Sequence, residues 1–524
     1  MSGSETLEPT GPAAATETAG IALLAVALTA LWHAALGDIG LNLQDEGFLW
    51  YGVLRVAEGA VPLRDFQSYD PARYYWCALW TPLFGGGIAG LRAALALFQA
   101  AGLCCGLLVA RRVVRPVWAL VPVGLVLLLW SFPRWKVFEP SIALMAALLA
   151  TRLVESPSAR RHFAAGAFAG LVACFGRNHG AYALASFSLL SLYLGWKRHA
   201  LGLGRNLALL AAGAALGYVP VLLAMGLVPG FATSSVEFSQ SHLRRGSNLP
   251  LPYPWPWTTR WVGLSLAKFA GQASLALYFV APFVIYPVGL VSLLRSRAEQ
   301  LVPRSVWVGT LFVGACYMHH VSVRSDAPHL AQSLPPLLLS ILALPTLLPR
   351  LDQPRARALL LAALALTTGL AALAEHPLLR PLALGQKLAT HRVGQNELRV
   401  EPALARLLTR LEAIVAREVP AGADLFVVPR QPTFYPLLER KSPFYELYTT
   451  WDAGESDQRE MIETLKRQGV NWGLVNSAAQ DGRPELAFPR THPSFWAHLN
   501  DEFERVPTPG LPPAYSLFRR RAQP

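Results

Sequence analysis

Two adjacent carboxylates, Asp45 and Glu46, are the residues whose types and position best suit chemistry. They lie within residues 41–59, at the start of a predicted amphipathic helix that runs through Glu58. A carboxylate in this position can act as a general base that takes a proton from an incoming hydroxyl. Acids in the first turn of a helix are also stabilised by its dipole and can cap its free amides, so a structural interpretation stays open. The apolar residues expected to face the membrane are Phe48, Tyr51 and Leu54.

The next polar stretch, residues 61–76, carries further acids, a cation and a run of aromatic residues. The planar guanidinium of Arg73 could grip phosphate oxygens bidentately. It could equally anchor the chain at the lipid headgroups while its stem lies in apolar surroundings. The neighbouring residues that we expect to contact a substrate are Asp70, Tyr74 and Tyr75.

Polar residues return in later connections between apolar segments. These connections contain Arg177, Arg324 and His329, and we expect His179, which lies in one of them, to contact a substrate. Charged residues close to membrane depth are costly unless they meet a partner or an aqueous cavity, which favours a functional interpretation. The pair His319-His320 is open to two interpretations, interfacial packing or a metal site.

The elements that must position these residues are predominantly membrane-spanning helices. The 524 residues are 53% hydrophobic and only 15% charged, and apolar runs recur from about residue 19 to about residue 373. The net charge of +13 is explained by basic cytoplasmic loops, and no basic stripe lies on a soluble module, so we expect no nucleic-acid partner. The five cysteines lie in apolar stretches without metal-ligand spacing and are expected to be packing residues.

Eleven spans fit the hydropathy pattern. They are expected near residues 19–37, 88–110, 116–132, 138–154, 162–176, 178–196, 207–229, 270–294, 304–321, 331–348 and 356–373. With these spans, five basic clusters fall on one side, which must be cytoplasmic. The clusters are Arg111, Arg112 and Arg115; Arg152, Arg160 and Arg161; Lys197, Arg198 and Arg205; Arg295, Arg297 and Arg304; and Arg350, Arg355 and Arg357.

This orientation predicts three regions. Residues 1–18 would be a disordered cytoplasmic tail, 19–375 a membrane domain with an outward first loop at 38–87, and 376–524 an outer domain. It also requires residues 72–110 to cross only once. We therefore expect Tyr74 to Leu83 to lie at the interface, with Gly85-Gly86-Gly87 breaking the chain before the second span.

The region 376–524 has the composition of a soluble α/β domain. Helices are predicted at Leu398 to Ala416 and at Ser456 to Gln468, with Gly469 ending the second. Buried strands are predicted at 424–428 and 470–475. No phosphate-binding glycine loop or catalytic constellation is evident in it. We expect this domain to cap the outward cavity, to contact the acceptor, or to be purely structural.

One outward loop is stiff and aromatic. Residues 249–257 alternate proline with aromatic and apolar residues, and Arg244-Arg245 precede them. The loop could cover a lipid-binding groove or lie at the headgroups, and the arginines could attract anionic headgroups or lipid phosphate.

The order of these motifs resembles a known family. A first span, Asp-Glu-Gly, an amphipathic helix, the run Gly59-Ala-Val-Pro-Leu-Arg-Asp-Phe66 and a proline-aromatic turn resemble the GT-C glycosyltransferases. More narrowly, the chain resembles bacterial relatives of protein O-mannosyltransferases and aminoarabinose transferases. Residues 177–182 and 324–336 are similar to further outward motifs of that group.

The resemblance implies roles for individual residues. Asp45 matches the family's catalytic base, and Glu46 matches the companion acid that shapes the site. The resemblance makes Arg73, Arg177, Arg324 and His329 the candidates for gripping the donor phosphate. The chain departs from the family at Asp70-Pro71, where many members carry a lysine before the proline-aromatic turn.

We therefore predict a GT-C-like polytopic α-helical membrane protein of about eleven spans with a small outer α/β domain. The predicted activity is inverting transfer of a sugar from a polyprenyl-phosphate donor to an acceptor hydroxyl, with Asp45 as base, at the extracytoplasmic face of a bacterial inner membrane. The acceptor could be a lipid, a glycan or a protein. We expect no cofactor; a divalent metal is compatible with the site, but nothing in the sequence indicates one.

Two other classes of protein remain open from the sequence. In a transporter or a flippase for lipid-linked saccharides, the intramembrane charges would line a substrate path, and an inverted repeat or broken midplane helices would favour this class. A non-catalytic scaffold that has kept the fold is the second alternative, because the family's lysine is missing.

Overall fold

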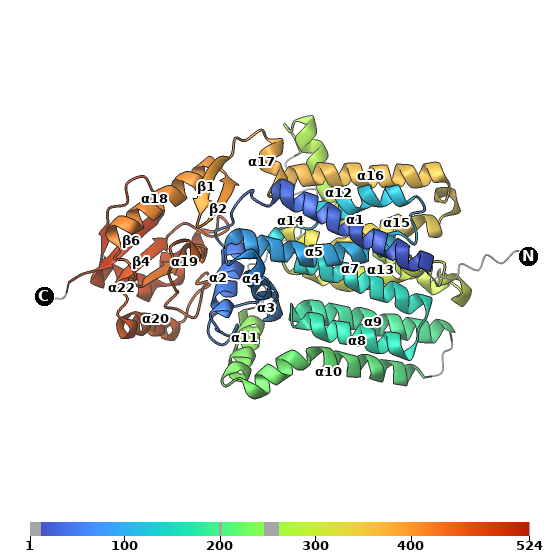
Figure 1. Ribbon diagram of the computed structural model, residues 1–524, viewed down its shortest axis with the longest axis horizontal. Coiled ribbons are helices and arrows are strands. Elements are labelled where there is room, and N and C mark those ends of the chain that lie inside the picture. The colour runs from blue at the N-terminus through green and yellow to red at the C-terminus, as the bar shows by residue number, and fades with distance from the viewer. Residues whose placement is uncertain (1–11, 199–201, 246–260, 523–524) are drawn as a thin grey trace, which may run out of the picture. The chain divides into compact units, whose positions relative to one another are not determined.

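The computed structural model describes residues 12–198, 202–245 and 261–522, which form two compact units (Figure 1). The first, called the helical unit, comprises Met1–Gly37, Ala93–Ala232 and Val236–Leu384. The second, called the mixed unit, comprises Asp38–Arg92, Thr233–Ser235 and Gly385–Pro524. The loop after the first helix thus belongs to the same compact unit as the C-terminal region.

The helices that lie mainly in the helical unit occupy all the predicted spans. They are α1 (Pro12–Leu36), α5 (Ile88–Ala110), α6 (Leu120–Leu129), α7 (Phe138–Glu155), α8 (Ala159–Ala173), α9 (Arg177–Arg198), α10 (Leu203–Leu227), α11 (Phe231–Arg245), α12 (Leu266–Arg295), α13 (Ser305–Val323), α14 (Ala327–Ser333), α15 (Pro335–Ala343), α16 (Pro354–Glu375) and α17 (Leu379–Ala383).

The helices at the predicted spans differ in length and apolarity. Within the described ranges, six are long and apolar enough to cross a membrane, namely α1, α5, α10, α12, α13 and α16. The pair of α14 with the segment Pro335–Thr346, bent by 54°, would make a seventh as a broken span. The other four predicted spans correspond to α6, α7, α8 and α9, which are shorter or more polar. The chain is a multi-pass membrane protein, and six or seven of its described helices or helix pairs are by themselves long and apolar enough to be spans.

The first helix starts earlier than the sequence pattern predicted. Helix α1 begins at Pro12, so residues 12–18, expected in a disordered tail, are helical instead. Proline is well suited to the first helical position, and the alanines that follow have high helix propensity.

Close helix packing in this unit rests on small residues. Helices α8 and α10 lie side by side (Figure 1). A Cβ atom on Gly166 would lie 2.0 Å from the carbonyl oxygen of Leu210, and one on Gly213 would lie 2.2 Å from that of Phe163. Small residues let helix backbones approach closely, which is how helices associate in lipid without a hydrophobic driving force.

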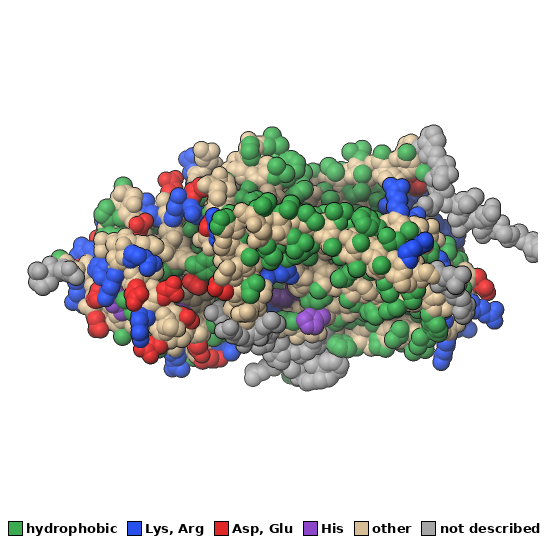
Figure 2. Space-filling model, turned by 90° about the horizontal axis from the view of Figure 1, so that it is seen from below, with side chains coloured by type: hydrophobic (Ala, Val, Ile, Leu, Met, Phe, Trp, Pro, Cys, Tyr) green, Lys and Arg blue, Asp and Glu red, His purple; other side chains and the backbone are tan. Residues whose placement is uncertain are grey.

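The surface of the helical unit suits a lipid environment. On the face shown in Figure 2, hydrophobic side chains cover most of this unit, whereas charged side chains of both signs are scattered over the mixed unit. Exposed large hydrophobic residues include Leu31, Leu223 and Val288 on three of the long helices. Contiguous exposed apolar surface of this kind marks a membrane-facing region.

The mixed unit combines the loop after α1 with a small α/β fold. Its helices are α2 (Asp45–Ala57), α3 (Ala72–Leu79), α4 (Thr81–Phe84), α18 (Pro402–Glu418), α19 (Phe434–Leu437), α20 (Glu455–Gln468), α21 (Phe488–Thr491) and α22 (Pro493–Glu502). Its strands are β1 (Ala389–Val393), β2 (Asn396–Val400), β3 (Leu425–Val428), β4 (Trp472–Asn476), β5 (Phe503–Val506) and β6 (Tyr515–Arg520).

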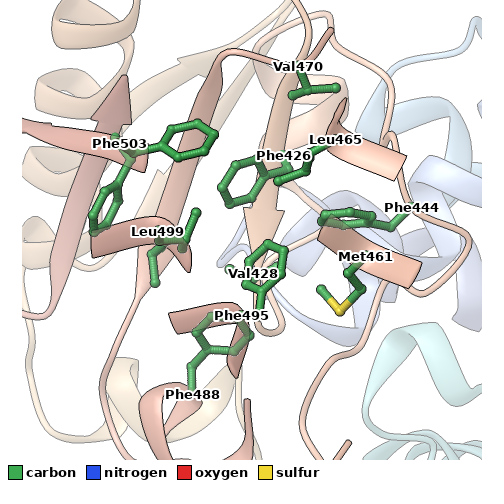
Figure 3. Close-up of a cluster of buried hydrophobic side chains, with 12 residues drawn as sticks. Phe426, Val428, Phe444, Met461, Leu465, Val470, Phe488, Phe495, Leu499 and Phe503 are labelled. Atoms are coloured by element: carbon green, nitrogen blue, oxygen red, sulfur yellow. The ribbon is translucent and has the colours of Figure 1, made fainter. Parts of the chain in front are cut away.

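A four-stranded sheet of order β3-β4-β6-β5 forms the core of the C-terminal part. Strands β3 and β4 are parallel and joined through α20, which ends at Gly469 in the left-handed conformation, as predicted. Strand β6 pairs antiparallel with both β4 and β5. Twelve buried residues, including Phe426, Leu465 and Phe495, fill the space between the sheet and its helices (Figure 3). The hairpin of β1 and β2 and the strands β5 and β6 were not predicted.

The segment before α5 has the predicted break. Residues 72–84 form α3 and α4, which at 1.5 Å per residue are each far too short to cross a bilayer. Gly85 follows with a positive φ of 79°, which ends α4. The indole nitrogen of Trp50 donates to the carbonyl oxygen of Gly86 at 2.9 Å, so α2 is hydrogen-bonded to the glycine segment that follows α4.

Candidate functional site

The side chain of Asn42 binds backbone amides at the first turn of α2. The side-chain oxygen of Asn42 accepts hydrogen bonds from the backbone amides of Gln44 at 3.1 Å and Asp45 at 2.7 Å. Asn42 therefore satisfies the open amides at the helix start, which is the task that the structural interpretation gave to the acids. The Asp45 carboxylate can make contacts of another kind.

Those contacts come from the far end of the chain. The hydroxyl of Tyr448 donates to Oδ1 of Asp45 at 2.6 Å, and a guanidinium nitrogen of Arg430 lies 3.6 Å from the same oxygen. The Asp45 side chain keeps 26% of its surface exposed, and that of Arg430 keeps 14%. A carboxylate that is oriented by fixed partners yet still accessible meets the geometric requirements of a general base.

Tyr448 is held by the first loop itself. The side-chain oxygen of Gln67 accepts from the backbone amides of Leu447 at 2.9 Å and Tyr448 at 2.8 Å. The amide of Gln67 donates to the carbonyl of Tyr445 at 2.8 Å, and the Tyr445 hydroxyl donates to the carbonyl of Leu63 at 2.7 Å. Hydrogen bonds from both the backbone and the side chains, donated in both directions, therefore fix the register between the two segments.

The segment that carries Arg430 fits tightly against α2. The amide of Thr433 donates to the carbonyl of Leu43 at 3.3 Å, and its hydroxyl donates to the carbonyl of Asn42 at 3.2 Å. A Cβ atom on Gly47 would lie only 1.9 Å from Oγ1 of Thr433 and 2.4 Å from its backbone nitrogen. The glycine of the Asp-Glu-Gly motif is therefore required for this close approach.

An aromatic row with a cation at each end lies beside Asp45. The ring of Phe48, one turn along α2, contacts Tyr448 at 4.5 Å and Tyr69 at 4.9 Å between centroids. Arg430 lies 5.0 Å from the centre of the Tyr448 ring, and Arg73 lies 5.2 Å from that of Tyr69. These distances suit cation–π contacts, which hold the two guanidinium groups in defined positions.

The local charges maintain this arrangement. Burial alone would lower the pKa of Arg430, but the carboxylate of Asp45 raises it above its usual value, so the guanidinium stays charged. Burial, and then the negative charge of Asp45, raise the pKa of Tyr448 well above its usual range. Tyr448 therefore keeps its proton and acts as the donor to Asp45.

Glu46 has a different environment from its neighbour. Its carboxylate accepts from Nε of Arg92 at 2.8 Å and from Nη2 of Arg92 at 2.9 Å, and both side chains are 1% exposed. Arg92 also donates to the carbonyl of Gly40 at 2.6 Å. A buried bidentate pair of this kind fixes the start of α2 and the chain that leads into it. This geometry fits the companion-acid role that the family resemblance implies.

The phenolic and acidic candidates near Arg73 have unequal exposure. Tyr74 is fully buried, and its hydroxyl accepts from the amide of Tyr69 at 2.9 Å, so it supports the loop from within. Tyr75 is exposed, and Asp70 is half-buried.

Phe48 and Tyr51 were predicted to face the membrane, which is wrong: both are buried within the mixed unit, because its C-terminal residues cover that face of α2.

Two of the remaining candidates lie at the start of α9 in the helical unit. Arg177 donates to the hydroxyl of Ser239 at 2.6 Å and lies 4.7 Å from the centre of the Phe238 ring. His179 is buried between the rings of Tyr317 and His320. Both therefore belong to a packed polar region of the helix bundle.

Arg324 and His329 share one carboxylate in the same unit. Asp326 accepts from Nε of Arg324 at 2.7 Å through one oxygen, and its other oxygen lies 2.6 Å from Nδ1 of His329. His320 contacts His329 ring to ring at 5.3 Å, and its Nε2 lies 2.9 Å from Gln332. Among the described residues, no three His, Cys, Asp or Glu side chains are placed to hold a metal ion.

The candidates thus fall into two groups. The mixed unit brings together Asp45, Glu46, Asp70, Arg73, Tyr74 and Tyr75, and the helical unit brings together Arg177, His179, Arg324 and His329. The proline-rich stretch 249–257 lies outside the described residues, as do the side chains of Arg244 and Arg245.

Sequence analysis missed three residues of this site. Arg92 is a lone charge in an apolar helix, a signal that was available. Arg430 follows the carboxyl end of β3, the edge at which open α/β sheets bind ligands, so its position also carried a signal. Tyr448 lies in a loop without any distinguishing pattern, and only the tertiary structure identifies it.

Comparisons with known proteins bear on the fold. No protein-family model and no curated protein matches the sequence. Among solved structures, the chain is similar to ArnT from Cupriavidus metallidurans bound to undecaprenyl phosphate. The identity is 14%, the match covers 98% of this chain and 99% of that chain, and the TM-score is 0.52.

Two further structures are similar at lower scores. The apo state of ArnT from Cupriavidus metallidurans is 15% identical over 97% of this chain and 99% of that chain, with a TM-score of 0.47. The oligosaccharyltransferase of Archaeoglobus fulgidus, in complex with Zn and sulfate, is 12% identical over 90% of this chain and 70% of that chain, with a TM-score of 0.46. The likeness to undecaprenyl-phosphate-bound ArnT establishes a GT-C fold and confirms the predicted fold class.

Proposed function

We propose that the chain is a membrane glycosyltransferase that moves a sugar from a polyprenyl-phosphate donor to an acceptor hydroxyl, with Asp45 as the general base. The observation that carries this proposal is the setting of Asp45. Its carboxylate contacts the Tyr448 hydroxyl and the Arg430 guanidinium and is still partly exposed, in a helix turn whose first amide is bound by Asn42. The resemblance of the sequence motifs to GT-C glycosyltransferases implies the same role for Asp45, and the fold is similar to that of ArnT from Cupriavidus metallidurans.

The chemistry follows from this arrangement. Asp45 would take the proton of the acceptor hydroxyl as its oxygen attacks the anomeric carbon, and the bond from that carbon to the phosphate oxygen would break. The leaving phosphate is a stabilised anion and needs no strong acid, only fixed positive charge. A single displacement inverts the anomeric centre, so a β-linked donor would give an α-linked product.

The candidate cations for the phosphate are the four that the family resemblance implies. Arg73, held over Tyr69, is the one that lies in the same compact unit as Asp45. Arg177, Arg324 and His329 remain proposed phosphate ligands of the helical unit. The undecaprenyl phosphate bound to ArnT from Cupriavidus metallidurans supports a polyprenyl-phosphate donor here. Arginine suits this task where the family's lysine is replaced by Asp70.

The positive-inside rule supports the proposed orientation. Basic clusters such as Arg111-Arg112 lie between apolar helices on the side opposite to the first loop in the predicted topology. The site would then face the extracytoplasmic side of a bacterial inner membrane, with a lipid, a glycan or a protein as acceptor. The sugar would reach it on a lipid carrier from within the bilayer.

The test measures release of polyprenyl phosphate by the purified full-length protein. Wild type and Asp45→Asn would be given polyprenyl-phosphate sugars with a mixture of acceptor classes. Because general-base catalysis contributes about 10²- to 10⁴-fold, the substitution should reduce turnover by that factor. Asp65→Asn is the matched control, since it removes an exposed carboxylate from the same loop, where Asp65 pairs with Arg64.

The outcomes separate the alternatives. Loss of turnover in Asp45→Asn with near-normal turnover in Asp65→Asn supports Asp45 as base. Equal turnover in wild type and Asp45→Asn contradicts that role. If the wild type turns over none of the lipid donors while it remains folded, the glycosyltransferase proposal itself fails and a transport function gains weight.

A further inference from the structure

We propose that Arg430 and Tyr448, both from the C-terminal part of the chain, are positioning residues that orient the carboxylate of Asp45 for proton abstraction. This inference rests on the proposed function and extends it, because it makes the C-terminal α/β fold part of the catalytic site. The family resemblance gave this region no catalytic role, and the sequence pattern gave it none either.

The geometry of the two contacts carries the proposal. The Tyr448 hydroxyl and the Arg430 guanidinium both approach Oδ1 of Asp45, at 2.6 Å and 3.6 Å. Two partners on one oxygen restrict rotation of the carboxylate about its Cβ–Cγ bond. A base must be oriented toward the proton that it removes, and small errors of orientation cost much of the rate.

The frame behind these two side chains is rigid. Tyr448 is bound through its backbone to Gln67 of the first loop. Arg430 is flanked by Pro429, whose carbonyl accepts from the amide of Thr449 at 2.9 Å. The segments that carry Arg430 and Tyr448 are therefore hydrogen-bonded to each other, and the Tyr448 segment is also hydrogen-bonded to the first loop. The fold thus sets the backbone positions of both partners relative to Asp45.

Stability alone does not explain Arg430. Its side chain is largely buried, and its Nε atom has no hydrogen-bond partner among the residues that the structure describes. Burying a charge with incomplete hydrogen bonding is costly, and an apolar residue of similar volume would usually serve the fold as well or better. We infer that the buried charge is kept, in spite of this free-energy cost, because it orients the carboxylate of Asp45.

Other titratable groups surround the pair. Tyr69 and Asp481 act electrostatically on Arg430, and Arg73 lies over the Tyr69 ring. Glu46, the neighbour of Asp45 on α2, is neutralised by Arg92. These groups are unchanged when Tyr448 or Arg430 is replaced, so the effect of each replacement on Asp45 can be measured against a constant background.

The proposal predicts a change in pH dependence with a definite sign. Hydrogen bonds and positive charge favour the charged form of a carboxyl and lower its pKa. Removing the Tyr448 hydroxyl or the Arg430 charge must therefore raise the pKa of Asp45. Since the base is active only when ionised, the acid limb of the kcat/KM profile should move to higher pH in both variants.

The experiment compares four variants of the full-length protein across pH. In Tyr448→Phe and Arg430→Met, kcat should fall about ten- to hundred-fold, the range for a lost hydrogen bond to a charged group, while KM for the lipid donor changes little. Arg430→Lys keeps the charge and should return the acid limb toward wild type. Tyr445→Phe is the matched control, because it removes a similar bond between the same two segments, to Leu63 instead of Asp45.

A second measurement does not depend on turnover. Carbodiimide modifies protonated carboxyl groups, so its reaction with Asp45, followed by peptide mass spectrometry, should show a higher midpoint pH in Tyr448→Phe and Arg430→Met than in wild type. Equal labelling midpoints and equal acid limbs in wild type, Tyr448→Phe and Tyr445→Phe would overturn the positioning role. If the labelling midpoints of the variants are shifted from that of wild type, but the wild type shows no turnover, the positioning role is supported and the proposed function is rejected.

Discussion

Two carboxylates at helix starts, one in each unit, have partners of opposite kinds. Asp326 in the helical unit is bound by residues within three positions, since Arg324 and His329 both contact its carboxylate and the amide of His329 donates to it. Asp45 in the mixed unit is bound by Tyr448, 403 residues further along the chain. Both acids are ion-paired, but one pairing is local and the other depends on the tertiary fold.

The difference explains what each acid can do. Asp326 caps α14 and neutralises its neighbours, so it is committed to structure. At the start of α2 it is Asn42 that binds the first amide, and Asp45 contacts Tyr448 and Arg430 from a distant segment, although the two carboxylates are similarly exposed, at 23% for Asp326 and 26% for Asp45. A carboxylate becomes available for proton transfer when its local structural role is taken over by another residue. The comparison can be tested by weakening each arrangement in turn.

The largest loss of stability is expected when the buried ion pair of Glu46 and Arg92 is broken. Replacing Arg92 with Met would leave the buried Glu46 without its cation, which should destabilise the mixed unit by about 3–5 kcal/mol. Hydrogen exchange of the α2 amides in the full-length protein would measure the loss. Arg64→Met, which breaks the exposed pair with Asp65, should cost less than about 1 kcal/mol in the same measurement.

A smaller loss is expected when α2 is pushed away from its partner segment. In Gly47→Ala the added methyl group would overlap Thr433, whose backbone cannot move aside, and the strain should cost about 1–3 kcal/mol. Turnover should fall as well, because Asp45 would separate from Tyr448. Gly454→Ala, where a Cβ meets only ordinary contacts, is the control. Unchanged hydrogen exchange at Phe434–Leu437 in Gly47→Ala would contradict the tight fit.

Removing the local contacts of Asp326 should cost less stability than either of these changes. Asp326→Ala removes the cap of α14 and should cost about 0.5–2 kcal/mol, seen as faster exchange of the α14 amides. Ser158→Ala removes the cap of α8, where no ion pair contributes, and should cost the same or less. If Asp326→Ala instead unfolded the bundle, the carboxylate would have a structural role beyond its own helix.

The smallest effect is expected where a pair is long-range but exposed. Asp38 and Arg399 lie 2.6 Å apart, yet each keeps more than two-fifths of its side chain exposed. Arg399 lowers the pKa of Asp38, chiefly through its hydrogen bond, so the pair stabilises the fold above the ordinary aspartate pKa and loses this contribution as the pH falls through the lowered value. Asp38→Asn should cost less than about 1 kcal/mol at pH 7 in thermal melting, and nothing at strongly acidic pH.

Much of the fold could be predicted from local pattern. Helices lie at all the predicted spans because apolar runs of this length have no other way to satisfy their backbone in lipid. Strand β3, strand β4 and helix α20 follow from periodicity and from Gly469. Helix α9 also lies at its predicted span, although it is less apolar than the six helices that are clearest as spans. Strands β5 and β6 were missed because short strands with charged residues carry a weak signal.

The candidate site, like the fold, could be predicted from the sequence only in part. The sequence determined that Asp45 and Glu46 start a helix after the first span, and it set out the local motif of Arg324 to His329. Only the tertiary structure decided that Arg92 neutralises Glu46, and that Arg430 and Tyr448 hold Asp45. The physical reason is sequence distance: periodicity and capping act over a few residues, whereas these pairings are made only when distant segments pack together.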